Sequence, residues 1–423
     1  MAAAAVLYAA CALTGLWLTR HGTRLHLGSA YPLSGHYRLH LSGWLVPAVL
    51  VAVAVGRWGF TLAQRLSWPR LLLAGYATAL AWAVALALVA GPSAIARPLT
   101  TPYEYLHDVA RIRGMGLATF LRTFARYVVG GPDVPAWTTQ VAGHPPGATL
   151  VFVALSRAGL GGAGWAAALV IAVGAAAVPA VLGTVRIAGG EEVARRAAPF
   201  VATAPLALWI ATSADALFAG VAAASLYALA RGAVRTGGLG LGVCLLLSYG
   251  LVLLAPPALA ALAAGRRPIT ARDMARDVAW AAGGVLAVLA VAAVAGFWWY
   301  HGLAVTRVRI YAGGGWRDRP GWYFVGANVA ALAVAAGPAA LAALPAAARR
   351  WRDPVLWLPG AALVAVGLAI ASGLSRGEVE RIYLPFAVWL PVLAAYLPGG
   401  RRGWLAAQLG LALLIAATTQ LDW

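Results

Sequence analysis

The sequence has no lysine, only 13 acidic residues and only 11% charged residues, although it is 423 residues long. Soluble globular domains carry about 25% charged residues. At the same time 62% of the residues are apolar, and the mean hydropathy is +0.79. The shortage of charge therefore excludes a soluble globular protein.

Cysteine is equally scarce, because Cys11 and Cys244 are the only two and both lie within apolar runs. Their number and placement argue against a disulfide framework and against a thiolate metal site. The N-terminal apolar run has no basic segment before it and no clear small-residue cleavage motif. We expect it to be a retained first helix.

All 32 basic residues are arginine, which, with the abundant alanine, glycine and valine, is typical of genomes of high GC content such as those of actinobacteria. A pI near 11.0 would indicate nucleic-acid binding in a soluble protein, but these arginines lie in short loops between apolar runs. That placement is typical of membrane proteins whose loops follow the positive-inside rule and contact lipid phosphate. We expect the bilayer, and no nucleic acid, as a partner.

Long apolar runs dominate what the sequence does contain. A spanning helix needs about 20 apolar residues, whereas barrel strands are alternating segments of about 10. The runs are of the first kind, and they predict an all-α, polytopic integral membrane protein with about 13 transmembrane helices. They lie at 2–19, 43–62, 70–92, 163–185, 197–212, 215–230, 237–250, 252–264, 279–297, 323–347, 354–374, 383–398 and 403–419.

The arginines predict the orientation. If the runs 237–250 and 252–264 are two passes, the loops after residue 186 place fourteen arginines, including Arg266 and Arg267, on the cytoplasmic side and six outside. This predicts a multi-pass plasma-membrane protein with a cytoplasmic N-terminus. The same topology places the segments 20–42 and 93–162 outside, although together they carry nine arginines. Either the topology fails there, or these arginines face something anionic outside.

The segment 93–162 is the longest polar stretch, and an idle loop of that length is uncommon. Residues 105–129 have the spacing of an amphipathic helix, which predicts a helix in the headgroup plane. The His-Pro-Pro-Gly sequence at 144–147 opens an apolar piece that is too short to cross the bilayer directly. It indicates a second interfacial or re-entrant helix.

Carboxylates near helix ends are candidates for function, because they are costly in a membrane protein. The topology places eight outside: Glu104, Asp108, Asp133, Asp215, Asp318, Glu378, Glu380 and Asp422. Asp108 is the preferred general base and Glu104 the alternative, although an acid at a helix N-terminus is also favoured by the helix dipole. Asp215, at an expected helix start, is either an N-cap or part of the site.

Three further groups complete the candidates. Glu378, Glu380 and Arg381 crowd into one short turn, which is either a solvated turn or a contact for an anion or a sugar. Arg317 and Arg319 lie in an aromatic-rich external loop that suits an interfacial belt or a phosphate with a sugar or isoprenoid. His144 has no second histidine or carboxylate at ligand spacing, so no metal site is expected.

Taken in order, these features resemble the GT-C superfamily of polyprenyl-phosphate-dependent membrane glycosyltransferases, which includes lipid A aminoarabinose transferases and protein O-mannosyltransferases. The resemblance covers roughly residues 70 to 400. It rests on an acid in a long external loop, a His-Pro-Pro helix start, an acid at an external helix start, an externally broken helix pair and a late Arg-x-Tyr-x-x-Pro sequence. These are similar to Glu104 or Asp108, His144, Asp215, the break at Tyr249, and Arg381 with Tyr383. Tyr249 stands where the family commonly has lysine, and two extra helices precede the module.

The resemblance implies an extra helix pair at 1–69, a catalytic module at 70–264 and completing helices at 265–423. It implies an inverting transfer of a sugar from a polyprenyl-phosphate donor to a hydroxyl of a glycan, lipid or protein acceptor on the external face. A carboxylate would act as general base, and Arg381 would contact the donor phosphate. No cofactor is certain, and a divalent cation is left open.

Two other classes remain open. A transporter or flippase of a lipid-linked saccharide would place ionisable groups near mid-membrane and contain internal repeats, neither of which is evident. A noncatalytic partner in an envelope assembly is the third class.

Overall fold

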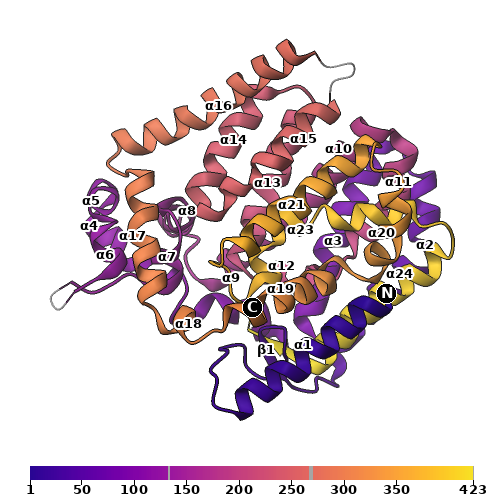
Figure 1. Cartoon of the computed structure of the whole chain (residues 1–423), viewed down its shortest axis with the longest axis horizontal. Helices are drawn as coiled ribbons and strands as arrows, with labels where there is room; N and C mark the ends of the chain where they lie inside the picture. Colours follow the sequence, from indigo (N-terminus) through magenta and orange to yellow (C-terminus); the bar gives the residue numbers. More distant parts are fainter. Residues whose placement is uncertain (132–133, 266–269, 423) are drawn as a thin grey trace.

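Helices make up nearly all of the regular structure (Figure 1), in a computed structural model that describes residues 1–131, 134–265 and 270–422. The first half contains α1 (Ala2–Arg20), η1 (Gly43–Leu45), α2 (Val46–Arg65), α3 (Trp68–Leu88), η2 (Pro92–Ile95), η3 (Arg97–Thr100), α4 (Leu106–Met115), α5 (Leu117–Thr123), α6 (Arg126–Val129), α7 (Thr139–Gly143), α8 (Pro146–Arg157), α9 (Ala163–Ala175), α10 (Ala177–Gly189), α11 (Glu191–Ala202) and α12 (Ala207–Ile210). The second half contains α13 (Ala214–Ala230), α14 (Val234–Leu247), η4 (Tyr249–Leu254), α15 (Ala255–Gly265), α16 (Ala271–Val294), α17 (Trp299–Ala312), α18 (Gly314–Arg317), α19 (Gly321–Ala336), α20 (Pro338–Ala348), η5 (Pro354–Leu356), α21 (Trp357–Ala371), α22 (Val379–Ile382), α23 (Leu384–Ala387), η6 (Leu390–Tyr396) and α24 (Arg401–Thr418). The only described sheet pairs β1 (Gly35–Tyr37) with β2 (Thr419–Leu421) antiparallel.

The predicted all-helical membrane protein is confirmed at this coarse level. Among the described residues, six helices are long and apolar enough to cross a membrane: 2–20, 43–65, 68–88, 163–189, 271–294 and 354–371. The pair α19 and α20 adds a seventh span if it is counted as one, although the two are bent by 99°. Gly337 causes this bend, because its φ of 88° ends α19 and Pro338 then begins α20. Other predicted runs coincide with shorter apolar helices, among them α13, α14 and the segment of η4 and α15.

Helix α13 lies at the centre of the core. It is apolar on all sides, as a buried helix must be, and it packs against α9, α10, α14 and α15. By contrast α16 is largely exposed along one edge of the molecule (Figure 1), which is typical of a helix that faces lipid. Helices α1 and α2 pack against α19 and α24, so the predicted N-terminal pair contacts the C-terminal helices directly.

The predicted interfacial segment consists of three short helices instead of one. Gly116, with φ of 79°, separates α4 from α5, and α6 follows as a further turn. The predicted apolar face is nevertheless buried, with Ile112, Phe120 and Phe124 at 1% exposure or less. The predicted helix after His144 also forms, since α8 begins at Pro146.

Contacts between segments that are distant in the sequence show which elements lie together at each end of the molecule. Pairing of β1 with β2 places the loop after α1 beside the end of α24, while the ends of α13 and α15 touch where Gly265 meets Ala230. The first of these ends is predicted to be external by the arginine distribution, and we call it the outer end.

The orientation is testable by cysteine labelling, because both native cysteines are buried. Ala136 is exposed in the loop before α7, and Trp351 is 67% exposed at the opposite end. In intact cells, a membrane-impermeant maleimide should modify Ala136→Cys and leave Trp351→Cys unmodified until the cells are opened. Equal labelling of both, or the reverse pattern, would contradict the predicted topology.

Candidate functional site

A cavity of about 860 Å³ opens at the outer end. Its size is within the range of about 300–1,000 Å³ that small-molecule sites occupy. It is lined by residues from six parts of the chain: His26 and Ser34; Thr101, Pro102 and Tyr103; Thr139, Gln140, Ala142 and Gly143; Thr306, Arg309, Ile310, Gly313, Gly315, Trp316 and Arg319; Leu374, Arg376 and Glu378; and Asp422.

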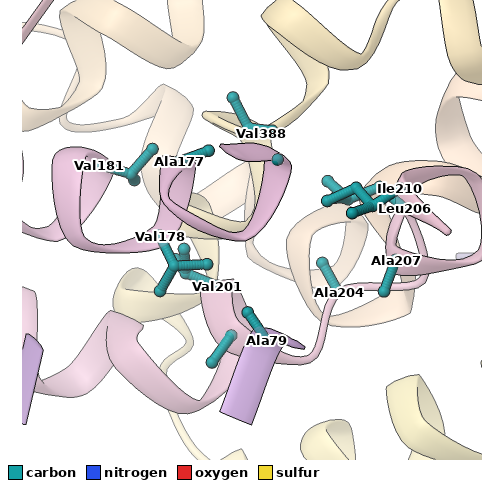
Figure 2. A pocket seen from close by; sticks show the side chains of 12 residues that line it. Ala79, Ala177, Val178, Val181, Val201, Ala204, Leu206, Ala207, Ile210 and Val388 are labelled. Atoms are coloured by element: carbon teal, nitrogen blue, oxygen red, sulfur yellow. The ribbon is translucent and has the colours of Figure 1, made fainter. Parts of the chain in front are cut away.

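A second pocket, in the hydrophobic core, differs from the outer cavity in both size and lining. It is enclosed by α3, α10, α11 and the segment around α12 (Figure 2), has a volume of about 20 Å³ and is lined by apolar residues such as Val181 and Ile210. A space of that size holds about one water molecule, and this one offers no polar side chain. It is a packing defect, so the outer cavity is the candidate site.

One face of α17 forms a wall of the cavity. Thr306, Arg309, Ile310 and Gly313 line it at a spacing of three, four and seven residues, which places them on the same side of a helix. The guanidinium of Arg309 donates to the carbonyl of Val128 on α6, and this bond holds α17 against the interfacial helices.

Arg376 provides a second cation on the cavity wall. Its guanidinium lies 3.9 Å from the ring centroid of Trp316 and donates to the carbonyls of Trp316 and Arg319. Neither Arg376 nor Arg309 forms an ion pair with a carboxylate of the described residues. Both cations therefore remain available to an anionic ligand.

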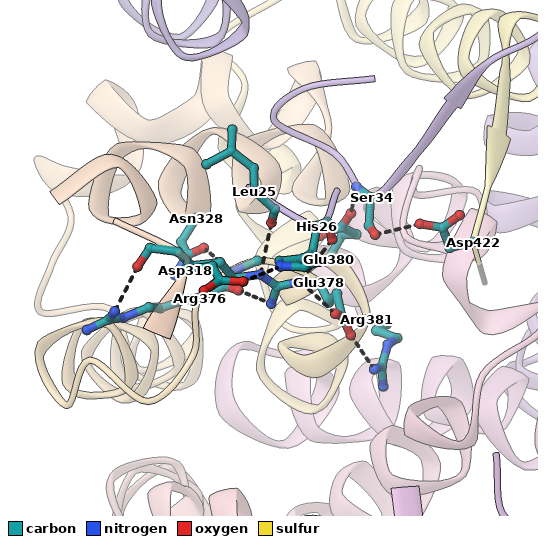
Figure 3. Close-up of polar contacts among 12 residues, drawn as sticks. Leu25, His26, Ser34, Asp318, Asn328, Arg376, Glu378, Glu380, Arg381 and Asp422 are labelled. Atoms are coloured by element: carbon teal, nitrogen blue, oxygen red, sulfur yellow. Dashed lines mark hydrogen bonds and ion pairs between the residues drawn. The ribbon is translucent and has the colours of Figure 1, made fainter. Parts of the chain in front are cut away.

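A buried chain of charges lies behind this wall (Figure 3). Arg381 on α22 donates to Asp215 Oδ2 and to Glu378 Oε2, each at 2.7 Å. Glu378 Oε1 in turn accepts from Arg319 at 3.1 Å. Arg319 also donates to the carbonyls of Leu25 and His26, so the chain of charges connects α13, α22 and the loop after α1.

Local structure explains how these groups meet. Asp215 lies in the first turn of α13, where the helix dipole favours a carboxylate, and its side chain reaches Arg381 instead of capping its own helix. Glu378 adopts a left-handed backbone with φ of 58° directly before α22. That turn directs its carboxylate between Arg319 and Arg381. Burial alone would raise the pKa of Glu378, but Arg381 and Arg319 together lower it.

Glu104 belongs to the same electrostatic neighbourhood. It is 4% exposed and follows Tyr103 of the cavity wall. Its carboxyl interacts electrostatically with Arg381, Asp215 and Glu378. Burial raises the pKa of the Glu104 carboxyl to about 7. A carboxyl of this pKa is partly protonated at neutral pH and can exchange a proton there.

Asp108, the preferred base, is placed differently. Its Oδ2 accepts from the backbone N–H of Thr138 at 2.8 Å, and its Oδ1 lies 3.7 Å from Arg111. Thr138 precedes α7, several of whose residues line the cavity, whereas neither Asp108 nor Glu104 is itself a lining residue. Asp108 therefore holds the backbone before α7. Glu104, by contrast, interacts electrostatically with the cluster of Asp215, Arg381 and Glu378.

Arg381 and Arg317 do not reach the cavity, although both were expected to be binding residues. Arg381 is 6% exposed and engaged by Asp215 and Glu378, while Arg317 is exposed and donates to the carbonyl of Tyr311. The arginines that line the cavity are Arg309, Arg319 and Arg376. In the sequence, the one signal for Arg309 is its position three residues after Thr306, which places both residues on the same face of a helix.

The other predicted residues lie outside the cavity lining. His144 Nδ1 lies 2.9 Å from the carbonyl of Gln140, and burial lowers the pKa of this histidine. Tyr249 packs against Trp299, and Tyr383 is buried after α22. Glu380 Oε1 accepts from the backbone N–H of Ser34 at 2.6 Å, and burial raises its pKa to about 7.

Two questions fall partly outside the described residues. Asp133 and the loop arginines Arg266 and Arg267 are among the residues that the structure does not describe. Within 1–131, 134–265 and 270–422, no group of three histidine, cysteine or carboxylate side chains could hold a metal ion.

No family model, no curated protein and no solved structure matches this chain.

Proposed function

We propose that the protein is a membrane glycosyltransferase that moves a sugar from a polyprenyl-phosphate donor to an acceptor hydroxyl at the outer face of the membrane. The observation that carries the proposal is the 860 Å³ outer cavity, in which two arginines without carboxylate partners lie beside a buried carboxylate cluster. A lipid-linked donor suits this location, because nucleotide sugars are cytoplasmic. The proposal includes the thirteen passes and the GT-C-like arrangement that the sequence resembles.

The phosphate of the donor binds Arg309 and Arg376 in this proposal. Guanidinium groups form short, charge-assisted hydrogen bonds to phosphate oxygens. During transfer, the bond between the anomeric carbon and the phosphate oxygen breaks, and its electron pair stays with the polyprenyl phosphate. Fixed arginines favour that step because they stabilise the charge that develops on the leaving oxygen.

The acceptor hydroxyl is activated by a carboxylate. Glu104 accepts its proton while the hydroxyl oxygen attacks the anomeric carbon from the face opposite the phosphate, which inverts the configuration. Glu378 and Asp422 are the carboxylates that line the cavity, but Glu378 is held by two arginines, which lower its pKa and make it a poor base. Glu104 directly follows Tyr103 of the cavity wall, and its raised pKa adds to this position to make it the better candidate.

The transport alternative predicts a different distribution of charge. Transporters place ionisable groups near the bilayer midplane, where substrates and ions bind. The Asp215–Arg381–Glu378 cluster instead lies beside the outer cavity. This placement favours chemistry at the surface over passage through the membrane.

The proposal is tested by the products formed in proteoliposomes. Wild-type protein given polyprenyl-phosphate mannose or polyprenyl-phosphate glucose, together with a glycan or lipid acceptor that carries free hydroxyls, should glycosylate the acceptor and release polyprenyl phosphate. Arg376→Ala and Arg309→Ala should each slow that release by about 10²- to 10³-fold, the usual cost of losing one oxyanion-stabilising donor. Arg317→Ala is the matched control, because Arg317 is exposed and outside the cavity, and it should release product at the wild-type rate.

Two results would overturn the proposal. Unchanged release in both cavity variants would remove the arginines from the reaction. Movement of the intact donor across the bilayer, without any cleavage, would instead establish a flippase.

A further inference from the structure

Three exposed arginines at the outer end have no role in the proposed reaction. Arg122 on α5, Arg126 on α6 and Arg307 on α17 are exposed, and none of them lines the cavity. None forms an ion pair with a carboxylate of the described residues; Arg122 donates to the carbonyl of Ala118, and Arg307 lies 5.9 Å from the ring centroid of Tyr311. The donor phosphate therefore does not explain the external arginine excess at these positions.

These arginines lie at the level where a membrane span ends. Helix α16 ends at Val294, and a Cβ atom on Gly296 would lie 2.4 Å from Cγ of Arg122. Phe124 and Phe297 also pack edge to face, with ring centroids 5.4 Å apart. Figure 1 shows α4, α5 and α6 gathered with α17 beyond this end of α16. The interfacial helices are thus anchored to the end of a lipid-facing helix.

The outward side chains are those of a surface that touches lipid. Trp298 and Tyr300, just after α16, are 61% and 64% exposed, as in the aromatic belts at membrane interfaces. On α17, Tyr300, Arg307, Val308 and Tyr311 face outward at helical spacing, opposite to the cavity face. Leu117 on α5 and Val129 on α6 are exposed as well. Apolar side chains with interspersed arginines are typical of helices that bury one face at the headgroup boundary.

We infer that the outward face of α5, α6 and α17 binds the phosphate headgroups of anionic phospholipids in the outer leaflet, through Arg122, Arg126 and Arg307. Cationic side chains at the level of the phosphates, flanked by exposed aromatic rings, complement such headgroups in charge and in depth. This site is separate from the cavity and does not depend on the proposed function.

The test uses delipidated full-length protein in a neutral maltoside detergent. The melting temperature is followed as dioctanoyl phosphatidylglycerol, dioctanoyl phosphatidylcholine or inorganic phosphate is added. The wild type should be stabilised by phosphatidylglycerol and not by equal concentrations of the other two. Arg122→Gln/Arg126→Gln/Arg307→Gln should bind phosphatidylglycerol on the order of 100-fold more weakly, at about five-fold per arginine.

Two control variants separate this site from other effects. Arg20→Gln/Arg24→Gln/Arg402→Gln removes three exposed arginines elsewhere and should keep the wild-type response. Arg376→Ala removes a cation of the cavity but leaves Arg309, which holds α17 to α6, in place. It should keep the wild-type response as well, which distinguishes this surface from donor binding. If the triple variant is unstable, the salt dependence of the wild-type response replaces it, since exposed charges are screened at high ionic strength.

The inference is overturned by any of four results. Equal stabilisation by phosphatidylcholine would show a general lipid effect, and stabilisation by inorganic phosphate would show a free-anion site. A triple variant that responds like the wild type would exclude these arginines. A response that is lost only in the Arg376→Ala variant would assign lipid binding to the cavity.

Discussion

Glu104→Gln should reduce sugar transfer by about 10²- to 10⁴-fold, the contribution that a positioned general base typically makes. Glutamine keeps the size of the side chain and removes its ability to accept a proton. Folding should be preserved, because the carboxyl is buried and protonates readily, with a pKa of about 7. Binding of the donor should also be preserved, since the cavity arginines are untouched. Initial rates of transfer and donor affinity measure the two effects separately.

Asp108→Asn is the matched variant. Its carboxylate holds the backbone N–H of Thr138, and an asparagine oxygen can accept that bond as well. We expect a small loss of stability and transfer that is largely retained. Full activity in Glu104→Gln with a dead Asp108→Asn would return the base to Asp108, and activity in both variants would contradict a catalytic carboxylate in this loop.

The pH profile gives an independent check on Glu104. A base must be ionised, so the second-order rate constant kcat/KM should fall about ten-fold per pH unit below about pH 7 and level off above it. The folded-state pKa lies above the value of 4.5 expected for the unfolded chain, so the folded protein binds more protons between these values and loses stability as the pH rises. Glu380 contributes in the same direction. Glu104→Gln should therefore reduce the fall in melting temperature between pH 4.5 and 7 without abolishing it.

Arg381→Leu should destabilise the protein by about 3 to 5 kcal/mol, which is the usual cost of removing one partner of a buried ion pair. The side chain is 6% exposed and is bound to Asp215 and Glu378 at 2.7 Å each. Its removal leaves Asp215 buried without its guanidinium partner, while Glu378 keeps Arg319. The loss is measured by thermal or SDS-induced unfolding in a constant detergent.

The double variant Asp215→Asn/Arg381→Leu should recover part of that stability, because it removes both charges together. Arg196→Gln is the control, since its partner Glu192 is exposed and such pairs contribute about 0 to 1 kcal/mol. Equal losses in Arg381→Leu and Arg196→Gln would show that the cluster does not stabilise the outer end. A double variant that is no more stable than Arg381→Leu would show that the two charges are not coupled.

The sequence allowed the type of fold and the location of the charged groups to be predicted, because both follow from local patterns. Apolar runs predict helices, and arginine-rich loops predict which ends lie together, so Asp215, Glu378 and Arg381 were expected at one end. The contact between them was not foreseeable in detail, since it joins residues 166 apart. Local patterns also did not distinguish Glu104 from Asp108, which differ in whether they face the cluster or the backbone of Thr138.

The pairing of β1 with β2 sets the order in which the cavity can be completed. Ser34 donates to the carboxylate of Asp422, which is 388 residues later in the chain, and both residues line the cavity. During synthesis the loop after α1 leaves the ribosome long before β2 does, so Ser34 is solvated or bound elsewhere until the segment 419–422 has been made and moved to the outer end. A chain whose translation is interrupted anywhere before that segment has a cavity that lacks Asp422 and the bond from Ser34. Closure of the cavity at this point therefore depends on a segment that is synthesised 388 residues after Ser34.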